Sequence, residues 1–454
     1  MKKPLLLLLS LQFFVVSAQD HLSGINTSKR IGLLNVSNNP AELSNLSSKY
    51  EVNLFSVSTI VSNNIVGFND IVDGENLEDL LFKGEKPVNF RLDSEIYGPG
   101  FAMRLKKWSF GFNTKGYIKA SVVDVNPSLG DAILNQAIQS IGGEPTKIKN
   151  DYNQRLNGTT WGEVGLSVAR NLYATDTKKF SAGVTLKLLF PGSYANFGVS
   201  QFTGTITNNT TEQTIRNATA NVNFAYSGNL ANSFVDFSDY SKSVFGGLSG
   251  YAADFGINYQ WKNKDKEEYK LNIGAAVKNI GSMTFKSDNN SSINYDLKIP
   301  RLPLPNTQFL DLNKFTNIES LQEIEKLLIN EGFLTKTDGG NANFKVNLPT
   351  VFSGYADIKV ISKFYLTLYT QQKLNDNGKN DQIITQNVVS VTPRFSFKNY
   401  ELFSSWADNE ISGTTGGFGL RICGFYLGSS SILTALTSDT KQADFYIGFQ
   451  YGLR

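Results

Sequence analysis

The chain has 454 residues, of which 41% are hydrophobic and 12% aromatic, and its formal net charge is +3. This near-neutral balance excludes the broad basic surface that a nucleic-acid partner would need. Cys423 is the only cysteine, so no internal disulfide can form.

The first residues have the pattern of a secretory signal peptide. Met1-Lys2-Lys3 is basic, an apolar stretch runs from Leu5 to Val16, and Ser17-Ala18 provides small residues before a cleavage site. We expect residues 1–18 to be removed after Ala18, which makes the protein an exported one. The apolar stretch is too short to span a bilayer, and no later segment reaches the roughly 18 uncharged residues of a membrane helix.

From residue 51 onward, apolar and polar residues alternate in runs of about 9 to 13, the length that a tilted strand needs to cross hydrocarbon. The run Tyr251–Trp261 has apolar side chains at every odd position and mostly small or polar ones between them. Aromatic residues at both of its ends suit the two membrane interfaces. Similar runs lie near 51–61, 98–105, 108–120, 160–171, 180–190, 195–207, 213–226, 269–277, 350–360, 362–372, 384–397, 399–407, 418–426 and 442–453.

This pattern predicts an all-β fold, a transmembrane antiparallel β-barrel of about 14 strands within a range of roughly 12 to 16. Residues 51–454 would form the barrel, and residues 19–50 would form a plug segment ahead of it. A soluble β-sandwich with one wet face is the alternative. It is less favoured because a sandwich buries its apolar face and rarely places Tyr and Trp at both ends of that face.

Three insertions, near 69–91, 127–142 and 300–345, interrupt the strand pattern with short helical patches. In the third, Thr316-Asn317-Ile318-Glu319 has the form of a capping box, and Gly332 would end the helix that follows. Long loops belong to the outer face of a membrane barrel and short turns to the periplasm. These helices could form a lid, bind a partner or simply cap the open end. Asp376-Asn377-Gly378 is expected to be a hairpin turn.

Charged residues of both signs fall on the polar face of the expected strands. Such a mixture fits either the lining of a pore or a network that locks a filled barrel. The candidate lumen-lining residues are Lys115, Lys119, Glu163, Lys187, Asp254, Lys270, Lys278, Arg394, Arg421 and Asp444.

The residues that catalysis usually needs are scarce. His21 is the only histidine, which argues against a histidine-dependent triad or a zinc site. Cys423 alternates with Arg421 toward the expected lumen side and has no evident base, so we interpret it as a small packing residue. No glycine-rich phosphate loop is present. We therefore expect no enzyme activity, no metal and no cofactor.

Several short motifs occur in an order that resembles a known superfamily. Asn39-Pro40-Ala41-Glu42-Leu43 precedes the first strand, Gly256-Ile257-Asn258-Tyr259 follows a glycine-rich entry, and Lys278-Asn279-Ile280-Gly281-Ser282 follows a strand. With the closing Asp444–Gly448, this order resembles the FadL-type outer-membrane barrels, which include fatty-acid transporters and the PorV-type proteins of Bacteroidota. The closest resemblance is to an uncharacterised outer-membrane barrel family of that phylum.

The resemblance implies about 14 strands and an N-terminal segment inside the lumen, with Asn39, Pro40, Ala41 and Leu43 as its plug motif. It also implies the cell outer membrane as the location, with membrane lipid and the barrel-assembly machinery as partners. Two functions remain open. The barrel could transport hydrophobic or small amphipathic molecules, as the transporter branch does. It could instead be a scaffold that binds an envelope protein in secretion or surface-protein handling, as the PorV-type branch does.

Overall fold

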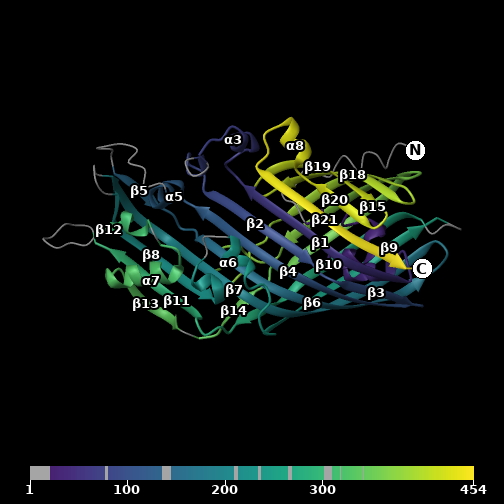
Figure 1. Cartoon of the computed structure of the whole chain (residues 1–454), viewed down its shortest axis with the longest axis horizontal. Coiled ribbons are helices and arrows are strands. Elements are labelled where there is room, and N and C mark those ends of the chain that lie inside the picture. Colours follow the sequence, from purple (N-terminus) through teal and green to yellow (C-terminus); the bar gives the residue numbers. More distant parts are fainter. Residues whose placement is uncertain are drawn as a thin grey trace.

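The computed structural model describes residues 21–76, 80–134, 145–208, 213–233, 237–263, 268–300, 309–316, 318–340 and 342–453. They form one antiparallel sheet that closes into a barrel (Figure 1), because the first strand pairs with the last. β1 (Tyr50–Asn63) lies against β21 (Gln442–Leu453) along almost its whole length. Closure satisfies the backbone groups that an open edge would expose, as a sheet in a membrane requires.

The described part of the chain gives the closed wall 14 strands, which confirms the expected fold. Gly98 and Pro99 interrupt the second strand without reversing it, so its halves β2 and β3 both pair with β1. In order round the wall, the strands after β1 are β2 (Val88–Tyr97) with β3 (Gly100–Leu105), β4 (Trp108–Val125), β6 (Gln154–Ala174), β7 (Lys178–Asn208), β9 (Gly250–Lys262), β10 (Tyr269–Phe285), β15 (Val351–Ile361), β16 (Phe364–Lys373), β17 (Val388–Ser396), β18 (Tyr400–Asn409), β19 (Gly413–Ile422), β20 (Phe425–Ser429) and β21.

Some strand boundaries differ from the sequence prediction. The runs 180–190 and 195–207 are one strand, β7, because the chain only bulges at Gly192 and does not turn. The run 418–426 is instead two strands, since the chain reverses at Cys423 and Gly424. Cys423 has a φ of +53° in that turn and is exposed, so it is not a lumen-facing packing residue. Residues 88–91, the first part of β2, were predicted to belong to the insertion at 69–91, and no strand was predicted over residues 92–97.

The two ends of the barrel differ in the length of their connections. At one end, β3 and β4 are joined by Lys106-Lys107, and β15 and β16 by two residues as well. At the other end, long segments such as 64–87, 126–153 and 374–387 join the strands. We call these the short-turn end and the long-loop end. Leu453, the last residue of β21, pairs with Tyr50 at the short-turn end.

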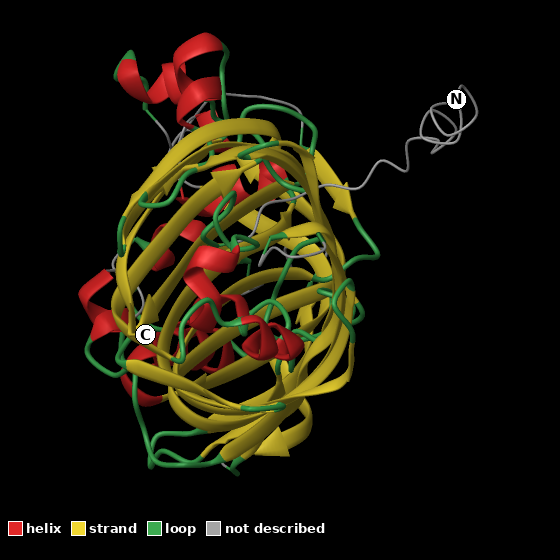
Figure 2. Cartoon of the chain, turned by 90° about the vertical axis from the view of Figure 1, so that its right-hand side faces the viewer, coloured by secondary structure: helices red, strands yellow, loops and turns green. Residues whose placement is uncertain are grey.

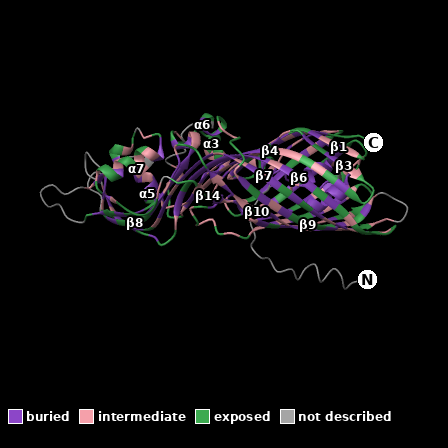
Figure 3. Cartoon of the chain, turned by 90° about the horizontal axis from the view of Figure 1, so that it is seen from below, coloured by how far each residue is buried: buried purple, intermediate pink, exposed green. Residues whose placement is uncertain are grey.

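The outer wall near the short-turn end carries a belt of exposed apolar side chains, and Figure 3 shows exposed residues alternating with buried ones along these strands. In β4, Trp108, Phe110 and Phe112 are 43%, 38% and 39% exposed, whereas Ser109 between them is 1% exposed. Leu166, Leu186 and many others continue the belt on neighbouring strands. Apolar residues outside and polar residues inside are the arrangement of a barrel surrounded by lipid.

Beyond the belt, β7 is 31 residues long and continues past the barrel into a sheet extension (left in Figure 1). A strand of that length spans about 100 Å, far more than a bilayer needs. The extension adds β5 (Thr146–Lys149), β8 (Gln213–Ser227), β11 (Ser291–Ile299), β12 (Leu310–Asp311), β13 (Leu334–Gly340) and β14 (Phe344–Asn347).

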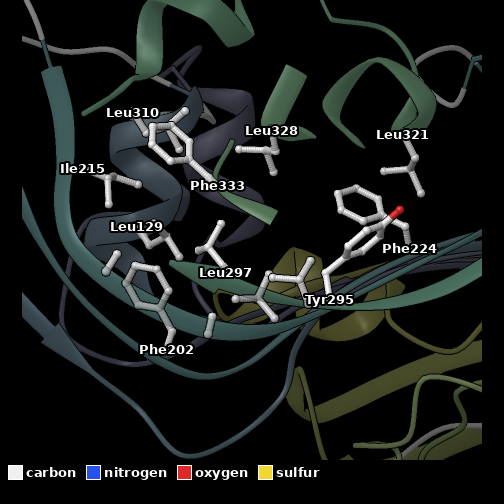
Figure 4. Close-up of a cluster of buried hydrophobic side chains, with 14 of the residues drawn as sticks. Leu129, Phe202, Ile215, Phe224, Tyr295, Leu297, Leu310, Leu321, Leu328 and Phe333 are labelled. Atoms are coloured by element: carbon white, nitrogen blue, oxygen red, sulfur yellow. The ribbon is translucent and has the colours of Figure 1, made fainter. Parts of the chain in front are cut away.

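The extension has a hydrophobic core of its own (Figure 4). Strand residues such as Phe202 and Phe224 pack there with Leu129 of α5 (Pro127–Leu134) and with Leu321 and Leu328 of α7 (Leu321–Asn330). The helix η4 (Leu312–Phe315) lies beside them. The described helices of the second and third insertions therefore cover the extension with apolar contacts rather than capping the open barrel.

The N-cap of α7 lies four residues later in the chain than the predicted N-cap, Thr316. Ser320 is the N-cap and accepts a hydrogen bond from the Glu323 amide at 3.3 Å, while Gly332, with a φ of +73°, follows its end as expected. Residues 77–79, 135–144 and 301–308, which include parts of all three expected insertions, lie outside the described residues, as does the expected signal peptide.

Apart from the helices that precede β1, the remaining described helices lie on the outside of the wall and at the long-loop end. α3 (Phe68–Val72) and α8 (Ile432–Thr437) are neighbours there (Figure 1), since the Phe68 amide donates to the Thr440 carbonyl at 2.8 Å. After η3 (Gly228–Ala231) and α6 (Phe237–Ser241), the chain crosses the outer wall, where Thr160 donates to the Ser243 carbonyl. Among the described residues, no helix is long and apolar enough to cross a membrane.

Candidate functional site

The lumen near the short-turn end is filled by residues 21–49, which we call the plug. It contains η1 (Lys29–Ile31), α2 (Gly32–Asn35) and η2 (Pro40–Asn45), and nearly all of its described side chains are buried. Figure 2 shows helices inside the ring of strands. A segment this short buries itself only because the wall supplies both apolar contacts and hydrogen-bond partners.

The plug motif lies against the wall. Asn39 caps η2, since its Oδ1 accepts from the Ala41 amide at 2.9 Å, and its Nδ2 donates to the Ile257 carbonyl at 2.8 Å. Pro40 passes so close to β7 that a Cβ on Gly183 would lie 2.5 Å from its carbonyl group, so only glycine fits there. Leu43 is fully buried in an apolar cluster with plug and wall residues.

Glu42, inside the same motif, anchors the plug by its carboxylate. Asn258 and Asn272 donate to its Oε1 at 2.9 and 3.0 Å, and the Tyr355 hydroxyl donates to it as well. The side chain is 5% exposed. Sequence analysis did not select Glu42, although it stands between residues that it did select.

A second element closes the lumen from the long-loop end. Residues 374–387, between β16 and β17, fold inward, and we call them the inner loop. Arg155, which is fully buried, donates to the carbonyls of Asn377 and Gln382 at 2.7 and 3.1 Å. Tyr194 donates to the Asn380 carbonyl at 2.8 Å. The predicted hairpin at 376–378 is therefore one bend of a long loop that is held inside the barrel.

A cavity of about 80 Å³, the chamber, lies between the plug and the inner loop. The plug contributes His21, Ser37 and Asn38, and the inner loop contributes Thr385 and Gln386. A larger cavity of about 560 Å³, the vestibule, lies on the other side of the inner loop. The charged and aromatic wall residues that line the chamber are Arg91, Asp93, Glu95, Tyr97, Lys115, Tyr117, Lys119, Trp161, Glu163, Lys187 and Lys278.

Most of the charges round the chamber are paired. Lys119 lies 2.5 Å from Asp93, which also pairs with Arg91. Lys187 lies 2.9 Å from Asp254 and 3.7 Å from Glu163. Burial of these charges is tolerable only because each has a partner and hydrogen bonds. Five of the predicted lumen residues, Lys115, Lys119, Glu163, Lys187 and Lys278, line this chamber, and Asp254 stands behind Lys187.

Two other predicted lumen residues, Arg394 and Arg421, form ion pairs in the part of the wall that contacts the plug. Arg394 lies 2.6 Å from Asp357, and Arg421 lies 2.9 Å from Glu401. Glu401 also accepts from the Ser28 hydroxyl of the plug at 2.8 Å. These pairs are therefore part of the polar floor on which the plug rests.

The last two candidates lie elsewhere. Lys270 is exposed on the outer surface over the Trp261 ring, so it does not face the lumen; a bulge at the start of β10 shifts its register. Asp444 is half-buried and accepts from Ser431 and the Ser430 amide at 2.6 and 2.8 Å, which fixes the segment ahead of α8.

His21 lies between Ser58 and two carboxylates. Its Nδ1 is 2.8 Å from Ser58 Oγ, and its Nε2 is 3.2 Å from Asp93 and 3.7 Å from Glu95. Serine, histidine and aspartate in contact are the components of a hydrolytic triad. Ser58, however, is buried and does not line the chamber, so its hydroxyl has no access to a substrate there. The trio joins the plug to the wall.

The most important residues that sequence analysis missed are Arg91, Asp93 and Glu95 of β2. They alternate with Phe90, Leu92 and Ile96, which is the same period-two signal that identified the other strands. They were missed because residue 91 was assigned to an insertion. Among the described residues, no group of three histidine, cysteine or acidic side chains is placed to hold a metal ion.

Comparison with known proteins gives one family and several structures. A family model described as "Family of unknown function (DUF5723)" matches residues 40–430. No curated protein matches the chain.

Several solved structures are similar to the chain at low sequence identity. The deltaS2S3 mutant of the monoaromatic hydrocarbon channel TodX is 10% identical, with a TM-score of 0.45 over 92% of this chain and 94% of that one. The Ralstonia pickettii toluene transporter TbuX is 10% identical, with a TM-score of 0.40 over 94% and 95% of the two chains. The Pseudomonas putida toluene transporter TodX is 9% identical, with a TM-score of 0.36 over 96% and 95%.

Proposed function

We propose, for a chain that belongs to the family of unknown function DUF5723, that it is an outer-membrane channel for small amphipathic molecules. The plug and the inner loop are its two gates. Export by a signal peptide that is cleaved after Ala18, and insertion by the barrel-assembly machinery, belong to the same proposal. Because short turns of outer-membrane barrels lie on the periplasmic side, the short-turn end would face the periplasm and the extension would face outward.

The observation that supports transport is an interrupted path through the lumen. The vestibule and the chamber share Arg91, Thr385 and Gln386 in their linings, so the inner loop separates them by only a few side chains. Below the chamber, the plug is held by polar contacts such as those of Glu42 as well as by apolar clusters with the wall. Polar contacts can be exchanged with water or a solute.

The lining of the chamber supports an amphipathic solute. The Lys115 ammonium lies over the rings of Tyr97 and Tyr117, and Trp161 stacks on Tyr117. An apolar wall with a few placed polar groups is typical of small-molecule sites. The outer-membrane location is supported by the apolar belt with its interfacial Trp and Tyr residues.

A scaffold that binds an envelope protein is the second candidate. It is favoured by the closure of the lumen at both ends and by the apolar residues Ile71, Val72 and Leu436, which are 50%, 67% and 75% exposed on α3 and α8. Native mass spectrometry of the protein extracted from its own membrane separates the two candidates. A retained small molecule supports the channel, whereas a stoichiometric protein partner without any ligand supports the scaffold.

Solute flux into proteoliposomes tests the channel directly. Glu42→Ala leaves Asn258, Asn272 and Tyr355 without their acceptor and weakens the plug by about 2 kcal/mol, so the variant should swell liposomes several-fold faster than the wild type. Glu331→Ala, which removes an exposed pair with Lys314 in the extension, should behave like the wild type. If limited proteolysis shows that the Glu42→Ala plug is released and flux still does not rise, the channel proposal is wrong.

A further inference from the structure

We propose that the chamber is a binding site for a small monoanionic carboxylate, and that Lys115 is the residue that holds its charge. The inference rests on the proposed channel function, because it names the class of solute that would occupy the path. Three observations support it: an unpaired buried ammonium, two unpartnered buried donors, and the size of the cavity.

Unlike Lys119 and Lys187, Lys115 forms no ion pair with a described residue. Its side chain is 5% exposed, and its Nζ lies 4.5 Å from the centre of the Tyr97 ring and 5.9 Å from that of Tyr117. No carboxylate of the described residues lies within ion-pair distance of it. Glu95 is near enough to interact electrostatically with Lys115, but its carboxylate accepts from the Tyr97 hydroxyl at 2.8 Å and lies 3.7 Å from His21, beyond ion-pair distance of Lys115. A buried charge without a counter-ion is costly, and a bound anion would remove that cost.

Two further hydrogen-bond donors in the lining lack acceptors within the described part of the chain. They are Trp161 Nε1 and Arg91 Nη1, and both side chains are nearly fully buried. Trp161 is held in place by stacking on Tyr117, with ring centres 4.2 Å apart and planes 10° from parallel. A carboxylate has two oxygens that accept several hydrogen bonds, which is the complement that these donors require.

Charge and volume restrict the anion further. The lining of the chamber carries five lysine and arginine side chains, and three carboxylates of the lining together with Asp254 oppose them. The excess of one positive charge, with His21 counted as neutral, suits a monoanion better than a phosphate dianion. A cavity of about 80 Å³ accommodates a carboxylate with a short tail. The rings of Tyr97 and Tyr117 provide an apolar surface for that tail.

Isothermal titration calorimetry of the full exported chain in mild detergent tests the site, with sodium acetate as the probe. We expect one acetate per chain, and no binding of neutral acetamide or of methylammonium. Lys115→Gln should weaken acetate binding at least tenfold, while Lys115→Arg should retain it. Lys270→Gln is the matched control, because it removes a lysine on the outer surface and should leave binding unchanged. Trp161→Phe should weaken binding several-fold.

The outcomes separate this inference from the channel itself. Folding of each variant is checked by its heat-dependent migration on a gel, and Trp161→Phe provides the test if Lys115→Gln does not fold. Absence of acetate binding by the wild type, or equal binding by Lys115→Gln, overturns the carboxylate site. If liposome swelling is observed in that case, the channel proposal stands without it. Acetate binding without any solute flux supports the site and contradicts the channel.

Discussion

Individual charged residues inside the barrel are arranged mainly to join the plug to the wall. Glu401 connects Arg421 of one strand with Ser28 of the plug, and Asp93 connects Lys119 with His21. Buried ion pairs add little net stability, because desolvation offsets their attraction. They are demanding in geometry, however, and breaking one partner is costly. Such pairs define one position for the plug, in addition to the apolar clusters that pack it against the wall.

His21 gives the plug a pH dependence. Burial by itself would lower the pKa of this plug residue, but the carboxylates of Glu95 and Asp93 outweigh burial and the nearby Lys119, so the pKa is raised above the ordinary 6.5. Ionised His21 therefore stabilises the fold fully below about pH 6.5, and this contribution is lost as the pH rises through the raised, folded-state pKa.

We expect His21→Gln to lower the thermal unfolding temperature more at pH 5.5 than at pH 8.5, as measured by circular dichroism in detergent. Ser58→Ala is the control, since it removes only the neutral hydrogen bond to His21 and should have a similar effect at both pH values. An effect of His21→Gln that does not change with pH would contradict an ionised His21.

The period-two pattern alone was enough to place single residues on the lumen face of the strands. It did so for Lys115, Lys119, Glu163, Lys187 and Lys278, which line the chamber. It failed where the backbone departs from regular alternation. Lys270 follows a bulge, and Cys423 lies in a turn. No sequence pattern could predict that Lys119 and Lys187 are paired while Lys115 is not, because their partners come from other strands.

At the scale of elements, the inner loop is the part that the sequence least revealed. Its turn residues at 376–378 resemble an ordinary hairpin, and its inward position depends on Arg155 from a strand more than 200 residues earlier. Because the loop is held by donors to its backbone carbonyls, a single side chain controls much of its order.

We expect Arg155→Met to release the inner loop, since it removes charged hydrogen bonds worth at least about 3 kcal/mol together. Hydrogen exchange should then accelerate in residues 374–387, and solute flux into liposomes should rise. Arg170→Met, which alters an exposed arginine over Trp108 on the outer wall, should change neither quantity. Unchanged protection of the loop in the Arg155 variant would show that other contacts hold it.

The helix α7 stabilises the extension and not the barrel. Leu328→Ala creates a cavity in the extension core and should cost about 2–5 kcal/mol locally. We expect hydrogen exchange to accelerate in β8 and β11 while β18 and β19 stay protected. Ile329→Ala, on the same helix but 45% exposed, should stay within about 0.5 kcal/mol of the wild type. Equal acceleration in β18 would mean that the barrel and the extension unfold as one unit.

The whole barrel is the level that the sequence predicted best. Alternation and terminal aromatics predicted a transmembrane barrel, because the wall strands obey the same inside-outside rule, and the resemblance to FadL-type barrels implied the 14 strands that the structure has. The extension was not predicted, because its strands bury one face against helices and show the same alternation as wall strands do. Only the strand pairing in the structure shows that β8 and β11 belong to the extension and not to the closed wall.

The belt predicts where a charge would prevent membrane insertion. Leu166 is 45% exposed, pairs with Phe112 on one side and Leu186 on the other, and lies within the belt. Leu166→Arg should destabilise the barrel in lipid vesicles by about 2–4 kcal/mol, measured by urea titration of refolding. Leu436→Arg on the exposed helix α8 should have almost no effect. If both variants refold equally, lipid does not surround the belt.

The pairing of β1 with β21 has a consequence for biogenesis. The plug immediately precedes β1, so we expect residues 21–49 to be enclosed by the curling sheet before the first and last strands join. Closing that seam without the plug inside would leave a barrel that its own N-terminus could enter only through an end. The connectivity thus predicts the order of assembly: the wall encloses the plug as the seam between β1 and β21 closes.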